Sequence, residues 1–223
     1  FIGHEIAWWW KARGDGAAFR VKHSIANDAP LLAVFPGSRN GEIKRLWPIF
    51  KQSIEQLAAK IPNLTIVIQV PPSMMERMQV AVDGWHIKPL LIDNREDKRG
   101  LFAAATAAIA KSGTIGLECA LAGLPSIVAY NANPLTAYLV RRMIRVKYVN
   151  LANLLAEKMI IPELIQEDCN ADAITKAMLP LLTNEHARDA QRRDLAHVAD
   201  LLGVNDAQSP SEKAADIVLG FLN

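Results

Sequence analysis

The stretch LLAVFPGSR, residues 31–39, joins a short apolar run to a proline–glycine loop. The uninterrupted apolar run, residues 31–35, is typical of a strand that is buried on both faces of a sheet. An apolar stripe over residues 43–61 follows the loop and predicts a helix. Pro48 lies inside that stripe, so we expect either a kink or a later start of the helix.

The same succession of strand and helix continues along the chain. Further buried strands are predicted at residues 64–70, 87–92, 107–110 and 125–130. Helical patterns separate them, at residues 73–82, 95–105 and 114–122. Alternation of this kind predicts a parallel sheet with helices on both faces, which is a Rossmann-like, doubly wound α/β fold. Beyond residue 133 we expect mostly helices, up to residue 223.

Residues 1–30 precede this regular pattern. Their charged and glycine-containing part predicts an interdomain linker, so the domain itself is expected to span residues 31–223. Trp8, Trp9 and Trp10 lie in this linker. Two interpretations remain open for them, packing under a neighbouring domain or anchoring at a membrane interface.

The composition is that of a soluble globular protein, with 51% hydrophobic and 22% charged residues. The 25 Lys and Arg residues exceed the 23 Asp and Glu residues by only two, so we expect no nucleic-acid partner. Cys119 and Cys169 are too few for a disulfide framework or a four-ligand zinc site. The five histidines show no pairing at one helical turn, so no metal is expected either.

Two loops of similar chemistry follow the first and fourth predicted strands. In the common strand order 3-2-1-4-5-6, ligands bind between these strands, at their carboxyl ends. Each loop leads into a helix, whose first N–H groups favour a phosphate or another anion. Gly37 and Gly113 allow close approach of the backbone because they have no Cβ. The loops add these polar side chains: Ser38, Arg39, Ser112 and Thr114.

Glu118 lies one helical turn beyond Thr114. A carboxylate there can accept hydrogen bonds from both hydroxyls of a ribose, whereas a solvated surface glutamate is the alternative. For either loop alone, an ordinary helix cap is the alternative to a phosphate site. Two such loops at the predicted switch point favour the phosphate site. The chain has no G-x-G-x-x-G and no G-x-x-x-x-G-K-[ST], which argues against a dinucleotide cofactor and excludes a P-loop.

A basic amphipathic stretch, PLTAYLVRRMIRVKY, occupies residues 134–148. It contains no acidic residue, and apolar residues alternate with its four cations, Arg141, Arg142, Arg145 and Lys147. Such a stretch can lie on an anionic membrane surface. A core helix with a solvated basic edge explains the pattern equally well.

Five motifs occur in order along the chain. They are P-G-S-R-x-x-E-I at 36–43, S-G-T-x-x-L-E at 112–118, G-x-P-x-[IV]-V-x-Y at 123–130, Y-V-x-L-x-N-L-L at 148–155 and P-E-L-x-Q at 162–166. The series resembles the C-terminal half of the lipid-A-disaccharide synthase family, and the resemblance covers essentially the whole chain. It implies the nucleotide-binding half of a GT-B glycosyltransferase, which has two Rossmann-like domains.

The resemblance also implies an activity. Members transfer 2,3-diacylglucosamine from its UDP carrier to 2,3-diacylglucosamine 1-phosphate, which gives a β-1,6 disaccharide and UDP without a metal or other cofactor. By motif, the diphosphate of the donor would be held by Ser38, Arg39, Ser112, Gly113 and Thr114. Glu118 would hold the ribose, and Asn153 would lie near the donor as a catalytic candidate. Arg39 would also compensate the charge on the departing UDP.

The family's acceptor-binding half and its catalytic carboxylate belong to an N-terminal domain. We therefore expect this chain to bind UDP but to transfer sugar only with such a partner half. The resemblance further implies a homodimer in the cytoplasm, peripheral on the inner face of a Gram-negative inner membrane. A non-catalytic UDP-sugar-binding module, or a GT-B transferase that uses UDP-N-acetylglucosamine, is the alternative.

Overall fold

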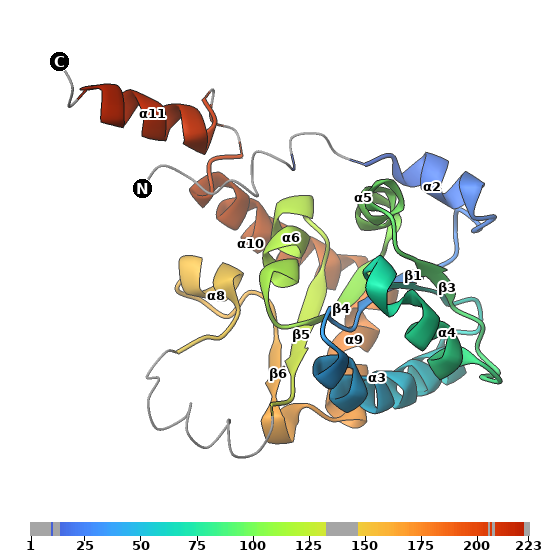
Figure 1. Ribbon diagram of the computed structural model, residues 1–223. Helices are drawn as coiled ribbons and strands as arrows, with labels where there is room; N and C mark the ends of the chain where they lie inside the picture. The colour runs from blue at the N-terminus through green and yellow to red at the C-terminus, as the bar shows by residue number, and fades with distance from the viewer. Residues whose placement is uncertain (1–9, 11–13, 133–146, 205, 207, 221–223) are drawn as a thin grey trace.

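The computed structural model describes residues 10, 14–132, 147–204, 206 and 208–220. In this part of the chain, six parallel strands form one sheet in the order β3-β2-β1-β4-β5-β6 (Figure 1). The five predicted strands therefore lie in the common order 3-2-1-4-5 that was used to locate the switch point, and a sixth strand, which the sequence analysis did not predict, lies beside the fifth. The strands are β1 (Leu31–Phe35), β2 (Thr65–Gln69), β3 (Leu90–Ile92), β4 (Ala107–Lys111), β5 (Ser126–Tyr130) and β6 (Glu163–Ile165).

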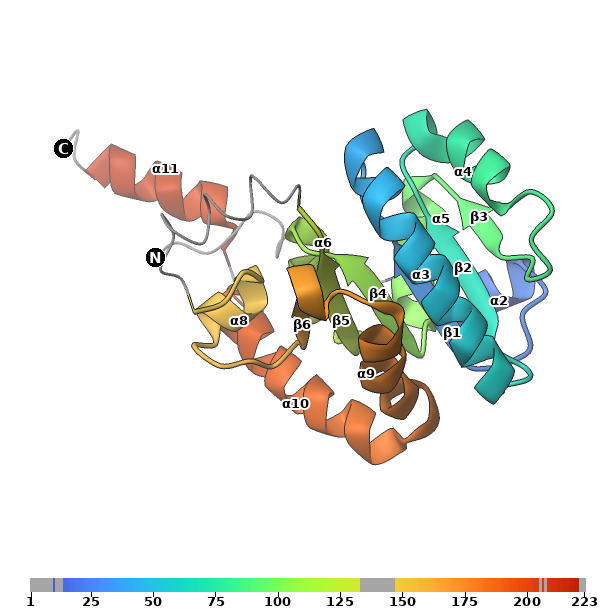
Figure 2. The same cartoon turned by 90° about the horizontal axis from the view of Figure 1, so that it is seen from below.

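Helices cover both faces of the sheet, as the alternating pattern predicts. In chain order they are α2 (Gly16–Lys22), α3 (Asn40–Lys60), α4 (Met75–Val82), α5 (Arg95–Ala104), α6 (Thr114–Ala122), α8 (Leu151–Leu155), α9 (Ala171–Thr183), α10 (Glu185–Leu201) and α11 (Pro210–Gly220). Short 3-10 turns are η1 (Pro72–Met74) and η2 (Gln166–Asp168). Helices α3 and α9 lie together on one face, whereas α11 extends away from the sheet (Figures 1 and 2).

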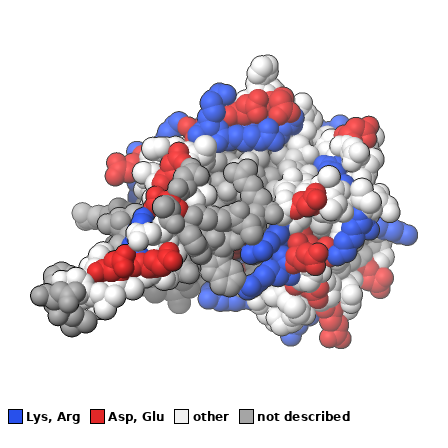
Figure 3. Space-filling view, turned by 90° about the horizontal axis from the view of Figure 1, so that it is seen from above, with Lys and Arg blue, Asp and Glu red and all other residues white. Residues whose placement is uncertain are grey.

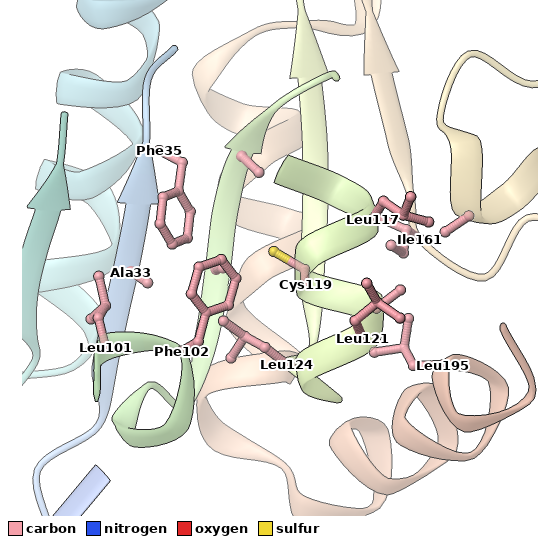
Figure 4. Packing of buried hydrophobic residues seen from close by; sticks show 14 of the residues in the cluster. Ala33, Phe35, Leu101, Phe102, Leu117, Cys119, Leu121, Leu124, Ile161 and Leu195 are labelled. Atoms are coloured by element: carbon pink, nitrogen blue, oxygen red, sulfur yellow. The ribbon is translucent and has the colours of Figure 1, made fainter. Parts of the chain in front are cut away.

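Strand β1 is fully buried because successive side chains enter two different cores. Leu31, Ala33 and Phe35 pack with α5, α6 and α10 on one face (Figure 4). Leu32 and Val34 pack with α3 and α9 on the other. On the first face, the ring of Phe35 stacks on Phe102 at a centroid distance of 5.0 Å, with Cys119 of α6 to the side of the Phe102 ring (Figure 4). The apolar run of residues 31–35 is thus explained by burial on both sides.

Two elements differ from the sequence-based expectation. Helix α3 begins at Asn40, ahead of Pro48, so a later start of this helix is wrong. Strand β6 lies in the segment that was expected to be mostly helical, and it pairs in parallel with β5. It has only three residues, with Glu163 as the first, which leaves too short an apolar run for recognition.

Helix α2 lies within residues 1–30, for which the sequence predicts a linker, and it packs directly on α5. Phe19 of α2 is buried, and a Cβ at Gly100 of α5 would lie only 2.9 Å from the Cβ of Phe19. Trp10 also contacts α5, since its ring meets Phe102 edge-on at a centroid distance of 4.7 Å. Trp8 and Trp9 lie outside the described residues. The described part of the expected linker is therefore packed against the sheet-covering helices.

On the face that Figure 3 shows, the basic and acidic side chains of the described residues are interspersed rather than separated. This mixing agrees with the small net charge of +2. Among the helices in the described ranges, none is long and apolar enough to cross a membrane.

Candidate functional site

A cavity of about 450 Å³ lies at the carboxyl ends of β1 and β4, where the strand order reverses. The structure brings five of the predicted site residues together in its wall: Ser38, Arg39, Gly113, Thr114 and Glu118. The wall also contains residues that the sequence analysis did not select, among them Glu42, Gln69, Lys98 and Lys111. The cavity is therefore polar and carries charges of both signs.

The two glycine loops form one side of this cavity. Gly37 has φ +112° and Gly113 has φ +153°, a region of backbone conformation that other residues rarely adopt. Gly113 is also the N-cap residue of α6. The bend at each glycine turns the chain from the end of a strand into the start of a helix, so both helices begin at the cavity.

Within the described residues, the two helices that begin at the cavity start without a side-chain cap. The N-cap residues of α3 and α6, Arg39 and Gly113, make no side-chain hydrogen bond to the first turn. In contrast, α2, α5, α8, α9 and α10 each begin with an Asp or Asn whose side chain accepts such a bond, while α4, after Met74, also begins without one. Ordinary capping by the loop serines is thus not observed. The N–H groups of Glu42 and Gly116 donate to the carbonyls of Arg39 and Gly113, whereas the N–H groups that precede them in each helix are available to an anion.

Three ion pairs line the cavity within the described part of the chain. Lys111 Nζ lies 3.1 Å from Glu42 Oε1, and Lys98 Nζ lies 2.7 Å from Glu118 Oε2. Arg39 is much more loosely held, because its side chain is 82% exposed and its Nη1 lies 3.4 Å from Glu42 Oε1. The better-ordered cations of the site are therefore the two lysines.

A second cavity, of about 480 Å³, adjoins the first. The two cavities share Gln69, Pro71, Lys98 and Glu118, so the Lys98–Glu118 ion pair lies on their common wall. Trp10 and Asn94 line the second of these two cavities but not the first. Glu118 thus lies between a charged compartment near the glycine loops and a compartment with an aromatic ring.

Two predicted site residues lie elsewhere. The side chain of Ser112 is buried and does not line the cavity. Asn153 is also fully buried, and its Oδ1 accepts hydrogen bonds from the backbone N–H groups of Ile160 and Ile161, both at 2.9 Å. Its Nδ2 donates to Ile161 O and to Glu163 Oε1, both at 2.7 Å. The Asn153 amide therefore joins α8 to β6 and is fully hydrogen-bonded.

The basic stretch is largely outside the structure. Arg141, Arg142 and Arg145 lie outside the described residues. Lys147 is described, and its exposed amine lies 5.2 Å from the centroid of the Tyr148 ring. The described residues contain no group of three or more His, Cys, Asp or Glu side chains that could hold a metal ion.

The two cysteines are buried packing residues. Burial raises the pKa of the Cys119 thiol to about 12 and that of the Cys169 thiol to about 11. Both thiols are therefore protonated at neutral pH, and neither lines the cavity at the glycine loops.

Residues 1–218 match the family of lipid-A-disaccharide synthetase. The chain belongs to this family. A lipid-A-disaccharide synthase of Rhodospirillum centenum is 40% identical over 222 residues, which cover 100% of this chain and 55% of the relative. A lipid-A-disaccharide synthase of Granulibacter bethesdensis is 39% identical over 232 residues, covering 100% of this chain and 59% of the relative. The chain thus spans little more than half the length of these curated relatives.

Solved structures with a similar fold include glycosyltransferases. WaaG, a glycosyltransferase involved in lipopolysaccharide biosynthesis, superimposes with a TM-score of 0.56 at 23% identity, covering 92% of this chain and 51% of WaaG. The Staphylococcus aureus MnaA structure with UDP gives a TM-score of 0.58 at 15% identity, covering 92% of this chain and 47% of MnaA. These similarities confirm the predicted GT-B-like Rossmann fold of this member of the lipid-A-disaccharide synthase family.

Proposed function

We propose that this chain is the donor-binding half of a lipid-A-disaccharide synthase. The complete enzyme transfers 2,3-diacylglucosamine from UDP to 2,3-diacylglucosamine 1-phosphate. One observation carries the proposal: two uncapped helix starts, each preceded by a glycine with positive φ, face one polar cavity at the switch point of the sheet. Membership of the family supplies the identity of the substrates.

The two adjoining cavities support one orientation of the UDP group. The diphosphate lies between Gly37 and Gly113, where the free helix N–H groups and the lysines are found. The ribose lies at Glu118, which is on the wall shared with the second cavity. The uracil then enters the second cavity, where Trp10 supplies an aromatic surface and Asn94 supplies an amide.

This orientation assigns a chemical role to the cations. When the acceptor hydroxyl attacks C1 of the donor sugar, the bond from C1 to the β-phosphate oxygen breaks and its electron pair stays on UDP. Negative charge therefore develops on the diphosphate, and fixed cations and N–H donors in the cavity stabilise it. Arg39 is one such cation, and we propose that no metal or other cofactor is required. The hydroxyl of the acceptor would be activated by the N-terminal half of the enzyme.

The remaining partners are proposed from the family. Both substrates carry acyl chains, so the enzyme would work at the inner face of the inner membrane, where Arg141, Arg142, Arg145 and Lys147 would contact anionic lipid. We also propose that the enzyme is a homodimer and that this chain works together with an N-terminal half. Mixing the chain with a purified N-terminal half should form disaccharide, whereas each half alone should not.

Calorimetric titration of the chain with UDP, with and without EDTA, tests the proposal. We expect saturable binding of one UDP per chain, with the same affinity in both buffers. UDP binding that requires a divalent cation would contradict the metal-free site. Absence of UDP binding would contradict the assignment of the cavity as a donor site in this chain.

A further inference from the structure

Lys111 occupies a position between the two glycine loops. It is the last residue of β4 and directly precedes Ser112 and Gly113. Its Cγ lies 3.6 Å from the position that a Cβ would take at Gly37. Its Nζ lies 3.6 Å from the corresponding position at Gly113. The side chain therefore spans the space between the loop after β1 and the loop after β4.

The amine of Lys111 is held from two further directions. Glu42, in the first turn of α3, forms an ion pair with this amine, with Glu42 Oε1 3.1 Å from Lys111 Nζ. The centroid of the Tyr130 ring, at the end of β5, lies 5.4 Å from Nζ, which is the distance of a cation–π contact. Side chains from the start of α3 and the end of β5 thus order the lysine before any ligand arrives. Binding a ligand then costs little additional side-chain entropy.

Lys111 and Arg39 differ in how much of the side chain is exposed to solvent. The Lys111 side chain is 18% exposed, whereas the Arg39 side chain is 82% exposed. A charge that is shielded from water interacts more strongly with a bound anion than one in bulk solvent. An ordered, largely buried cation is therefore better placed than Arg39 to stabilise charge at the glycine loops.

The ion pair with Glu42 leaves N–H donors of the Lys111 ammonium for a ligand. An ammonium group has three N–H donors, and the ion pair with Glu42 Oε1 uses one direction. The remaining donors are available to phosphate oxygens while Glu42 keeps the side chain in place. A point charge on a flexible stem also suits a diphosphate, whose negative charge is spread over several oxygens.

We propose that Lys111 binds the donor diphosphate and stabilises the charge on the departing UDP. This inference rests on the proposed function. As the bond from C1 to the β-phosphate oxygen breaks, the electron pair remains on that oxygen, and the Lys111 ammonium stabilises it through hydrogen bonds without transferring its proton. Lys111 is thus the main diphosphate cation, and the exposed Arg39 adds to it.

Three variants of the full chain test this role: Lys111→Met, Lys111→Arg and the control Lys60→Met. Methionine keeps much of the length but removes the charge, whereas arginine keeps the charge. Lys60 is exposed at the opposite end of α3 from the cavity. Calorimetric titrations with UDP and with uridine report on the diphosphate and the nucleoside separately. Thermal unfolding verifies that each variant is folded.

We expect Lys111→Met to weaken UDP binding about tenfold or more while uridine binding stays the same. Lys111→Arg should retain most of the UDP affinity, and Lys60→Met should match the unaltered chain. Unchanged UDP affinity in Lys111→Met, or an equal loss for UDP and uridine, would overturn the role of Lys111. If the unaltered chain itself binds no UDP, the proposed function fails first, and the role of Lys111 fails with it.

Discussion

Lys98 and Glu118 form an ion pair that joins α5 to α6, with Lys98 Nζ 2.7 Å from Glu118 Oε2. Both side chains are largely buried, at 26% and 16% exposure, and both line the two adjoining cavities. The pair holds one carboxylate oxygen of Glu118 and leaves the other for a ligand. A residue that the motifs assign to ribose binding is therefore positioned by a lysine that follows a different strand.

Glu118→Ala should remove the preference of the chain for UDP with both ribose hydroxyls over UDP without them. We expect the unaltered chain to bind UDP about tenfold more tightly than 2′,3′-dideoxy-UDP, because a hydrogen bond to a charged group contributes about 1.5–3 kcal/mol. In Glu118→Ala, the two ligands should bind equally, and Lys98→Met should lower the preference several-fold by releasing the carboxylate. Competition titrations with both nucleotides measure the ratio. A preference that persists in Glu118→Ala would place the ribose elsewhere.

Arg39→Ala should weaken UDP binding by several-fold without unfolding the chain. The loss is expected to be smaller than that of Lys111→Met because the Arg39 side chain is 82% exposed and loosely paired. Calorimetry with UDP measures the affinity, and Arg193→Ala, an exposed position on α10, serves as the matched control. Equal affinity in Arg39→Ala and the control would exclude Arg39 from the diphosphate site.

Asn153→Ala should destabilise the fold rather than impair UDP binding. The substitution leaves the buried N–H groups of Ile160 and Ile161 without their acceptor, which we expect to cost about 2–3 kcal/mol in the free energy of unfolding. Urea denaturation measures this loss, and calorimetry on the folded variant should give the UDP affinity of the unaltered chain. A variant of normal stability with weakened UDP binding would instead support a direct role at the donor.

Acidification should weaken the contact between α2 and α5, because it protonates the Asp97 carboxylate. Burial by itself raises the pKa of Asp97, but hydrogen bonds from Lys22, Asn94 and His23 outweigh it and lower the pKa to about 2. Because the pKa is lower in the folded state than in the unfolded state, the carboxylate stabilises the fold above about pH 4. This contribution, about 2 kcal/mol, should be lost as the pH falls towards 2.

Urea denaturation between pH 6 and pH 2 checks this expectation. Asp97→Asn should be less stable at pH 6 and should lose much less stability on acidification. The matched control is Asp83→Asn, at an exposed position after α4, which should behave like the unaltered chain. A pH dependence of Asp97→Asn equal to that of the control would contradict the assignment to Asp97.

Much of the fold could be predicted from local patterns. The buried strands at residues 31–35 and 107–110 and the helix at 114–122 have the predicted positions. Burial on both faces leaves a continuous apolar run in the strands, and Gly113 and Gly123 flank the helix. Strand β6 was missed because three residues carry too little periodicity. Helix α2 was missed because its seven residues include only Phe19 as a fully buried side chain.

The candidate site, like the fold, could be predicted from the sequence only in part. The two glycine loops were predictable because each directly follows a recognisable strand, and parallel strands place their carboxyl ends at one edge. Lys98, Lys111 and Glu42 were missed because their pairing connects residues on different elements. The motif containing Asn153 pointed towards the donor, yet the fold places its amide among the backbone groups that join α8 to β6.

The sequence by itself determined the alternation of strands and helices, the switch point and the loops that meet there, because hydrophobic periodicity and glycine conformation act over a few neighbouring residues. Only the tertiary structure decided which cations are ordered and which are solvated. Lys111 and Arg39 are both cations beside a glycine loop in the sequence, but packing against Glu42 and Tyr130 orders the former, while the latter extends into water. Electrostatic strength depends on burial and on partners distant in the chain, and folding alone establishes both.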